Sequence, residues 1–178
     1  MKILDVKSGE WKQVNFRYHQ HTILRSGFQS DAFTVCAGII VYFSERRLCA
    51  LMHSPPNHRV GVEFWEWFNA QDPNNQTQIV IIPSKVSGSN PGKIFDMVLS
   101  KMKKIGSHVN ILTRTENVRV MISAQGYEIY NYKNEVLTRE NWQRISQHHT
   151  RIPIFIGSSL NNRFETDNPM SYIPRYKK

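Results

Sequence analysis

Cysteine is scarce in this chain of 178 residues, which has only Cys36 and Cys49. A small secreted protein held together by disulfides usually carries more cysteines, so that class is excluded. The seven histidines form no H-E-x-x-H pattern, and no C-x-x-C pair is present, so we expect no metal site. A cofactor is not expected either.

Long apolar runs are also missing. The longest lies around Cys36 to Phe43, which is strand length and well below the ~18 residues that a membrane span needs. Asp5 interrupts the start of the chain where a signal peptide would be apolar. We therefore expect a cytoplasmic protein without a membrane span, although a chain exported by a dedicated secretion system would have the same features.

Acidic residues are outnumbered by basic ones, 14 against 23, giving a formal net charge of +9. Such an excess favours partners with an acidic surface, either a protein or a nucleic acid. The basic residues are scattered rather than gathered in one stripe, which makes nucleic acid the weaker of the two predictions. Length and composition are those of one globular domain over residues 1–178.

The pattern of apolar residues predicts an α/β (α+β) fold. Strands are expected at 32–43, 48–52, 79–82, 109–112, 118–123, 127–132 and 135–137, and helices at 60–70, 93–105 and 140–146. The first two strands should form a hairpin around a turn at 44–47. The aromatic run at 64–68 is either a docking surface for a protein or, for at least half of it, core packing under a helix. Residues 150–178 read as a C-terminal extension that is packed on the body or partly disordered.

Cys36 opens the first strand of this hairpin and His53 closes the second, 17 positions later. A hairpin would bring these two strand ends side by side, within reach of each other. A histidine beside a cysteine can accept the thiol proton and produce a nucleophilic thiolate. The alternative is that Cys36 is a small buried hydrophobic residue, which is how we interpret Cys49.

The segment from Cys36 to His53 resembles the core of the chemoreceptor glutamine deamidase family, CheD. A second likeness is the strand and loop from Ile81 to Ser89, and the order of elements agrees over about residues 28–138. The resemblance implies a layered β-sandwich core with flanking helices. It also implies a cysteine hydrolase fold shared with deamidating toxins of the cytotoxic necrotising factor type.

The same resemblance implies a protein-glutamine deamidase, in which Cys36 attacks the carboxamide and His53 moves the proton. The family's third catalytic group, a threonine, falls at Ser30, and Thr34 is a rival for that role. Lys85, Ser87 and Gly88 stand where the family has a substrate-binding loop, although the family's Gly-Gly-Ala is reduced here. The expected partner is a protein with an accessible glutamine and an acidic surface.

Two other functions remain open from the sequence. One is a non-catalytic basic module that binds nucleic acid or an acidic protein. The other is a secreted effector that deamidates a host protein rather than a chemotaxis enzyme, because both would have the same core.

Overall fold

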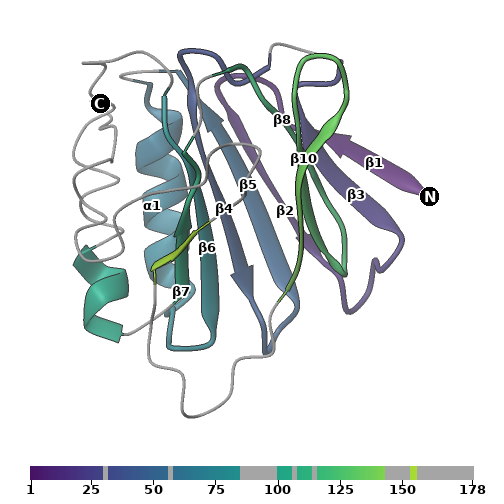
Figure 1. Ribbon diagram of the computed structural model, residues 1–178. Coiled ribbons are helices and arrows are strands. Elements are labelled where there is room, and N and C mark those ends of the chain that lie inside the picture. The colour runs from purple at the N-terminus through teal and green to yellow at the C-terminus, as the bar shows by residue number, and fades with distance from the viewer. Residues whose placement is uncertain are drawn as a thin grey trace.

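The computed structural model describes residues 1–29, 32–55, 58–84, 100–105, 108–113, 116–142 and 153–155. Two β-sheets lie face to face in this part of the chain, and helix α1 (Val60–Ala70) covers the outer face of one of them (Figure 1). Residues 100–105 are also helical. The predicted α+β fold, a layered β-sandwich with flanking helices, is confirmed. None of the described helices has the length and apolarity to cross a membrane.

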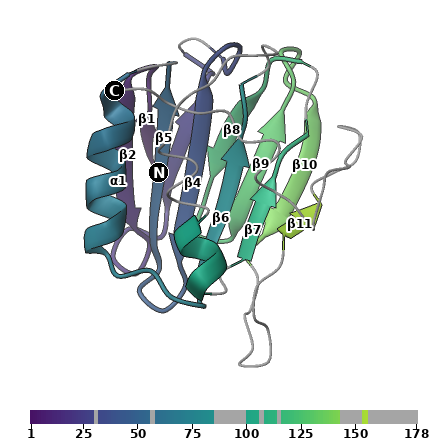
Figure 2. The ribbon, with the colours of Figure 1, turned by 90° about the vertical axis from the view of Figure 1, so that its left-hand side faces the viewer.

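The strands of each sheet follow an order that differs from their order in the chain. The smaller sheet has the order β1 (Lys2–Asp5), β3 (Thr22–Ser26), β8 (Arg119–Ile122), β9 (Gly126–Tyr130) and β10 (Val136–Asn141). The larger has the order β11 (Pro153–Phe155), β7 (His108–Ile111), β6 (Thr77–Ile82), β4 (Ala37–Phe43), β5 (Leu48–Ser54) and β2 (Glu10–Asn15). Figure 2 shows the larger sheet with α1 and the short helix in front of it.

The larger sheet is buried on both faces, which explains the continuous apolar run of its central strand. In β4, Ile40 and Tyr42 face the smaller sheet and join the core between the two sheets. Ile39 and Val41 face the other way and pack with α1. A strand that is covered on both sides cannot alternate apolar and polar residues.

The predicted hairpin is confirmed. Strands β4 and β5 are antiparallel neighbours, from Phe43 opposite Leu48 to Ala37 opposite Ser54. Arg47 completes the turn with a positive φ of 53°. Antiparallel pairing then places the start of β4 beside the end of β5, where Cys36 and His53 lie.

Two expectations at strand ends are wrong. The first strand begins at Ala37 rather than at residue 32, since Phe33 leaves this sheet and bridges to Val118 instead. The helix expected at 140–146 begins with two residues that end β10, where Glu140 pairs with Tyr127 and Asn141 with Gly126. Pairing with β9 therefore overrides the local helical pattern there, and residues 143–146 lie outside the described residues.

The structure describes one of the other expected helices completely, and the second helix and the C-terminal extension in part. The helix at 60–70 is confirmed, and residues 100–105 of the one expected at 93–105 are helical, whereas 93–99 lie outside the described residues. Of the expected extension at 150–178, only β11 is described, and it pairs in parallel with β7 at the edge of the larger sheet.

Candidate active site

Cys36 and His53 belong to the same face of the larger sheet. Gly38 pairs directly with His53, so these two residues lie on one face. Cys36 comes just before β4, and it packs in the core on that face with Ile40 and Tyr42. Cys36 is part of the core between the sheets, together with Phe33.

The ring of His53 is held on two sides. Its Nδ1 is 2.8 Å from Ser26 Oγ, at the end of β3 in the opposite sheet. Phe33 stacks on the imidazole with 3.8 Å between ring centroids and 18° between planes. Because Gly38 has no side chain, the Phe33 ring can lie against it: a Cβ at Gly38 would be 2.6 Å from Phe33 Cε1.

The hydroxyl of Ser26 fixes the tautomer of His53. A serine has one hydroxyl proton, and Ser26 Oγ donates it to the backbone carbonyl of Val6 at 2.5 Å. Towards the imidazole, Ser26 Oγ therefore acts as the acceptor, and Nδ1–H of His53 is the donor. A neutral ring with the proton on Nδ1 has its lone pair on Nε2, which is the form needed by a general base.

The turn between β1 and β2 brings a second hydroxyl to the thiol. Ser8 Oγ lies 3.5 Å from Cys36 Sγ. The turn is fixed by two backbone hydrogen bonds: Gly9 N–H donates to His53 O, and Glu10 N–H donates to Lys7 O. The Glu10 carboxylate also accepts from Lys7 N–H, and this hydrogen bond lowers the pKa of Glu10.

Both members of the pair are shielded from solvent to different degrees. His53 is 0% exposed and Cys36 is 6% exposed. Val35, the residue next to Cys36, is 44% exposed. Cys36 is therefore nearly buried beside an exposed residue, and His53 is fully buried.

Cys49 has a different environment, although it lies on the same sheet. It is 0% exposed, and burial raises the pKa of its thiol well above the usual range. A thiol with a raised pKa and no exposure is unreactive. Both cysteines are reduced thiols, so the two can be compared in one protein.

Only some of the predicted site residues belong to the part of the chain that the structure describes. Ser30, Lys85, Ser87 and Gly88 lie outside the described residues. Thr34 is partly buried, two residues before Cys36.

Sequence reasoning missed Ser26, Ser8 and Phe33. Ser26 carries a weak signal as the polar end of a strand with alternating burial, but its place beside His53 depends on how the two sheets meet.

The aromatic run at 64–68 packs into the core rather than forming a free surface. Phe64 and Phe68 are fully buried between α1 and the sheet, and Trp65 and Trp67 pack against the same cluster. The ring of Trp11 in β2 contacts Phe64 edge-on and lies tilted against the ring of Trp67. The core-packing alternative is therefore the one that the structure supports.

No group of three or more metal-ligating side chains gathers among the residues that the structure describes. No family model matches the chain, and no curated protein matches it. One solved structure with a similarity is a hypothetical protein, YfiH, from Bacillus licheniformis. It has 17% identity and a TM-score of 0.26, and the match covers 47% of this chain and 30% of that one. The likeness to glutamine deamidases therefore stays a prediction from the sequence.

Proposed function

We propose that this protein is a cysteine-dependent protein-glutamine deamidase. The observation that carries the proposal is the hydrogen bond between Ser26 Oγ and His53 Nδ1, because it leaves the lone pair of the imidazole on Nε2, as a base for the Cys36 thiol requires. The hydroxyl at Nδ1 and the stacked ring of Phe33 restrict the orientation of the imidazole, which is the role of the third group in a catalytic triad.

The chemistry follows from this geometry. His53 Nε2 accepts the thiol proton, and Cys36 Sγ attacks the carboxamide carbon of a glutamine side chain. The tetrahedral intermediate expels ammonia, which takes the proton from His53, and a thioester to Cys36 remains. Water, deprotonated by His53, then attacks the thioester, so that glutamate is released and the thiol is restored.

Two further residues would assist this sequence of steps. Ser8 Oγ, at 3.5 Å from the sulfur, can donate to the thiolate or to the oxyanion that forms beside it. Ser26 would keep the imidazole in one tautomer as the proton moves. Ser26 would then have the role that the sequence resemblance gives to Ser30, and for which Thr34 is the rival.

The limited exposure of Cys36 favours a substrate group that is narrow and reaches inward. A glutamine side chain has this character, because it is long, unbranched and uncharged, and Val35 beside the nearly buried Cys36 is exposed. A charged group would lose hydration on the way to the buried imidazole, which is costly.

The proposal is tested by trapping, which needs no knowledge of the natural substrate. A diazoketone analogue of glutamine should alkylate Cys36 and leave Cys49 unmodified, as peptide mass spectrometry reports. Substitution His53→Gln should slow the labelling, and an excess of a glutamine peptide should protect Cys36. Labelling of the two cysteines at equal rates would overturn the proposal.

Ammonia release supplies the second arm of the test. With a glutamine-rich unfolded protein as the probe, Cys36→Ala should abolish release, whereas the matched variant Cys49→Ala should retain it. Activity that survives in Cys36→Ala would also contradict the proposed chemistry.

A further inference from the structure

One side of the sandwich is bordered by the outer strands of both sheets. Strand β1 is an end strand of the smaller sheet, and β2 is an end strand of the larger one, in the part of the chain that the structure describes. Lys12 connects the two strands, since its Nζ donates to the carbonyl of Asp5 at 2.5 Å. An outer strand presents backbone N–H and C=O groups that can pair with another chain.

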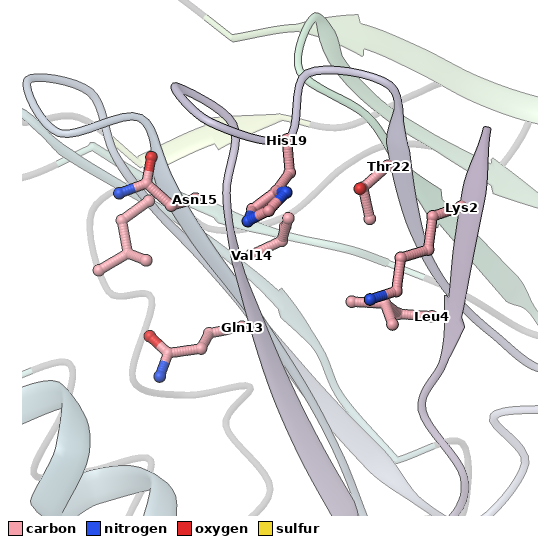
Figure 3. A pocket seen from close by; sticks show the side chains of 8 residues that line it. Lys2, Leu4, Gln13, Val14, Asn15, His19 and Thr22 are labelled. Carbon is pink, nitrogen blue, oxygen red and sulfur yellow. The ribbon is translucent and has the colours of Figure 1, made fainter.

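A cavity of about 400 Å³ lies at this border, away from the candidate active site. Its lining includes Val14, which faces the core between the sheets, and also Gln13 and Asn15, which point to the opposite face of β2 (Figure 3). Because side chains from both faces of β2 line it, the cavity extends around the outer edge and the C-terminal end of this strand. The volume is within the range of ligand-binding sites.

The hydrogen bonds of β2 show which backbone groups face this edge. Phe16 N–H donates to Arg47 O, so Phe16 belongs to a hydrogen-bonded pair in the ladder with β5. Such pairs alternate along an antiparallel ladder, so Val14 and Lys12 also face β5. The N–H and C=O of Gln13 therefore face the opposite direction, towards the cavity. Asn15 O follows the same rule, since it accepts from the backbone of the following turn.

The charge of the cavity selects for an acidic ligand. Lys2 and His19 are the titratable residues in its lining, and no aspartate or glutamate is among the residues that line it. The Asp5 carboxylate nearby is engaged with Arg25 at 2.7 Å. The net charge of the chain, +9, has the same sign.

We infer that β2 is a docking edge for an extended acidic segment of a partner protein. The segment adds to the larger sheet as a further strand, its backbone hydrogen-bonds to Gln13, and its carboxylates lie beside Lys2 and His19. This mode of recognition takes affinity from backbone hydrogen bonds and selectivity from alternate side chains. The inference does not rest on the thiol chemistry, and the variant Cys36→Ala should bind equally well.

The test uses the full chain and a capped peptide of alternating glutamate and valine, with the lysine–valine peptide as its charge-reversed partner. Titration followed by NMR should move the amide resonances of Gln13 and its neighbours in β2 with the acidic peptide alone. Affinity should fall as salt is added, because exposed charges are screened. Equal binding of the basic peptide, or shifts confined to another surface, would overturn the inference.

Two substitutions of Gln13 distinguish the contribution of its backbone N–H to binding from that of its side chain. Gln13→Pro removes the N–H that faces the edge and is tolerated at an outer strand, so it should weaken binding by roughly tenfold or more. Gln13→Ala keeps the N–H and should bind within about twofold of the wild type. Should Gln13→Pro fail to fold, Lys2→Glu decides the question, with Lys133→Glu on an exposed turn as its control.

A second copy of the chain is the competing occupant of this edge. Sedimentation of the protein without peptide distinguishes it. A dimer that Gln13→Pro dissociates would show that β2 pairs with another β2, and the acidic-partner inference would then be wrong. A monomer that binds the acidic peptide supports the inference.

Discussion

Replacing Ser26 with alanine removes the link between the two sheets at His53. Ser26 Oγ makes two buried hydrogen bonds, to Val6 O and to His53 Nδ1, and the serine is fully buried. Each bond contributes about 1 kcal/mol net, and each buried group that loses its partner adds a further desolvation cost of roughly 1–3 kcal/mol. We therefore expect Ser26→Ala to lower the free energy of unfolding by about 2–4 kcal/mol, measured by urea denaturation.

The same variant should change the imidazole itself. Without the acceptor at Nδ1, the proton is no longer held there, and ¹⁵N NMR of the His53 ring should show a mixture of tautomers. Ser44→Ala is the matched control, because Ser44 also donates to a backbone carbonyl, Gln76 O, at 2.8 Å and accepts from Gln78 Nε2. It should lose stability without altering the His53 signals. A loss below about 0.5 kcal/mol in Ser26→Ala, with an unchanged tautomer, would refute this reasoning.

Three further changes test the packing and the charges around the site. Gly38→Ala puts a methyl group 2.6 Å from Phe33 Cε1. This overpacking should displace the Phe33 ring from His53 and lower the free energy of unfolding by about 1–3 kcal/mol, measured by urea denaturation. An unchanged denaturation midpoint would contradict this prediction. Phe64→Ala empties a fully buried site under α1 and should cost about 3–5 kcal/mol, which calorimetry checks; a loss under 1 kcal/mol would mean that the helix repacks. Burial raises the pKa of the Glu140 carboxyl above 4.5 in the folded protein. The folded state is therefore favoured while this carboxyl is protonated, and this contribution to stability is lost as the pH rises through the folded-state pKa. Glu140→Gln should therefore gain stability relative to the wild type at pH 7 but not below pH 4.5, and equal differences in denaturation at both pH values would contradict the assigned shift.

Much of the sheet that carries the site could be predicted from the sequence. The apolar run before Ser44, the turn at 44–47 and the second apolar run determine a hairpin by strand period and turn chemistry alone. The register then follows from the length of the turn. The α1 helix could be predicted equally well, because its buried aromatic residues recur at helical spacing.

The groups that complete the site could not be predicted in this way. Ser26, Ser8 and Phe33 come from three segments that precede the hairpin. Ser26 reaches His53 because the two sheets stack, Ser8 lies in a turn whose Gly9 N–H donates to His53 O, and Phe33 lies in the connection before β4. Local propensity contains no information on which strands face each other across a sandwich. The same limitation applies to the end of β10, where pairing of Glu140 with Tyr127 determines the structure.

The most direct test of the account is the rate at which each thiol reacts with iodoacetamide as the pH is varied. We predict that Cys36 reacts much faster than Cys49 near neutral pH, and that His53→Gln removes most of this advantage while the fold is retained. If Cys36 reacts as slowly as Cys49, or at the same rate with and without the imidazole, then His53 does not activate the thiol and the proposed chemistry is wrong.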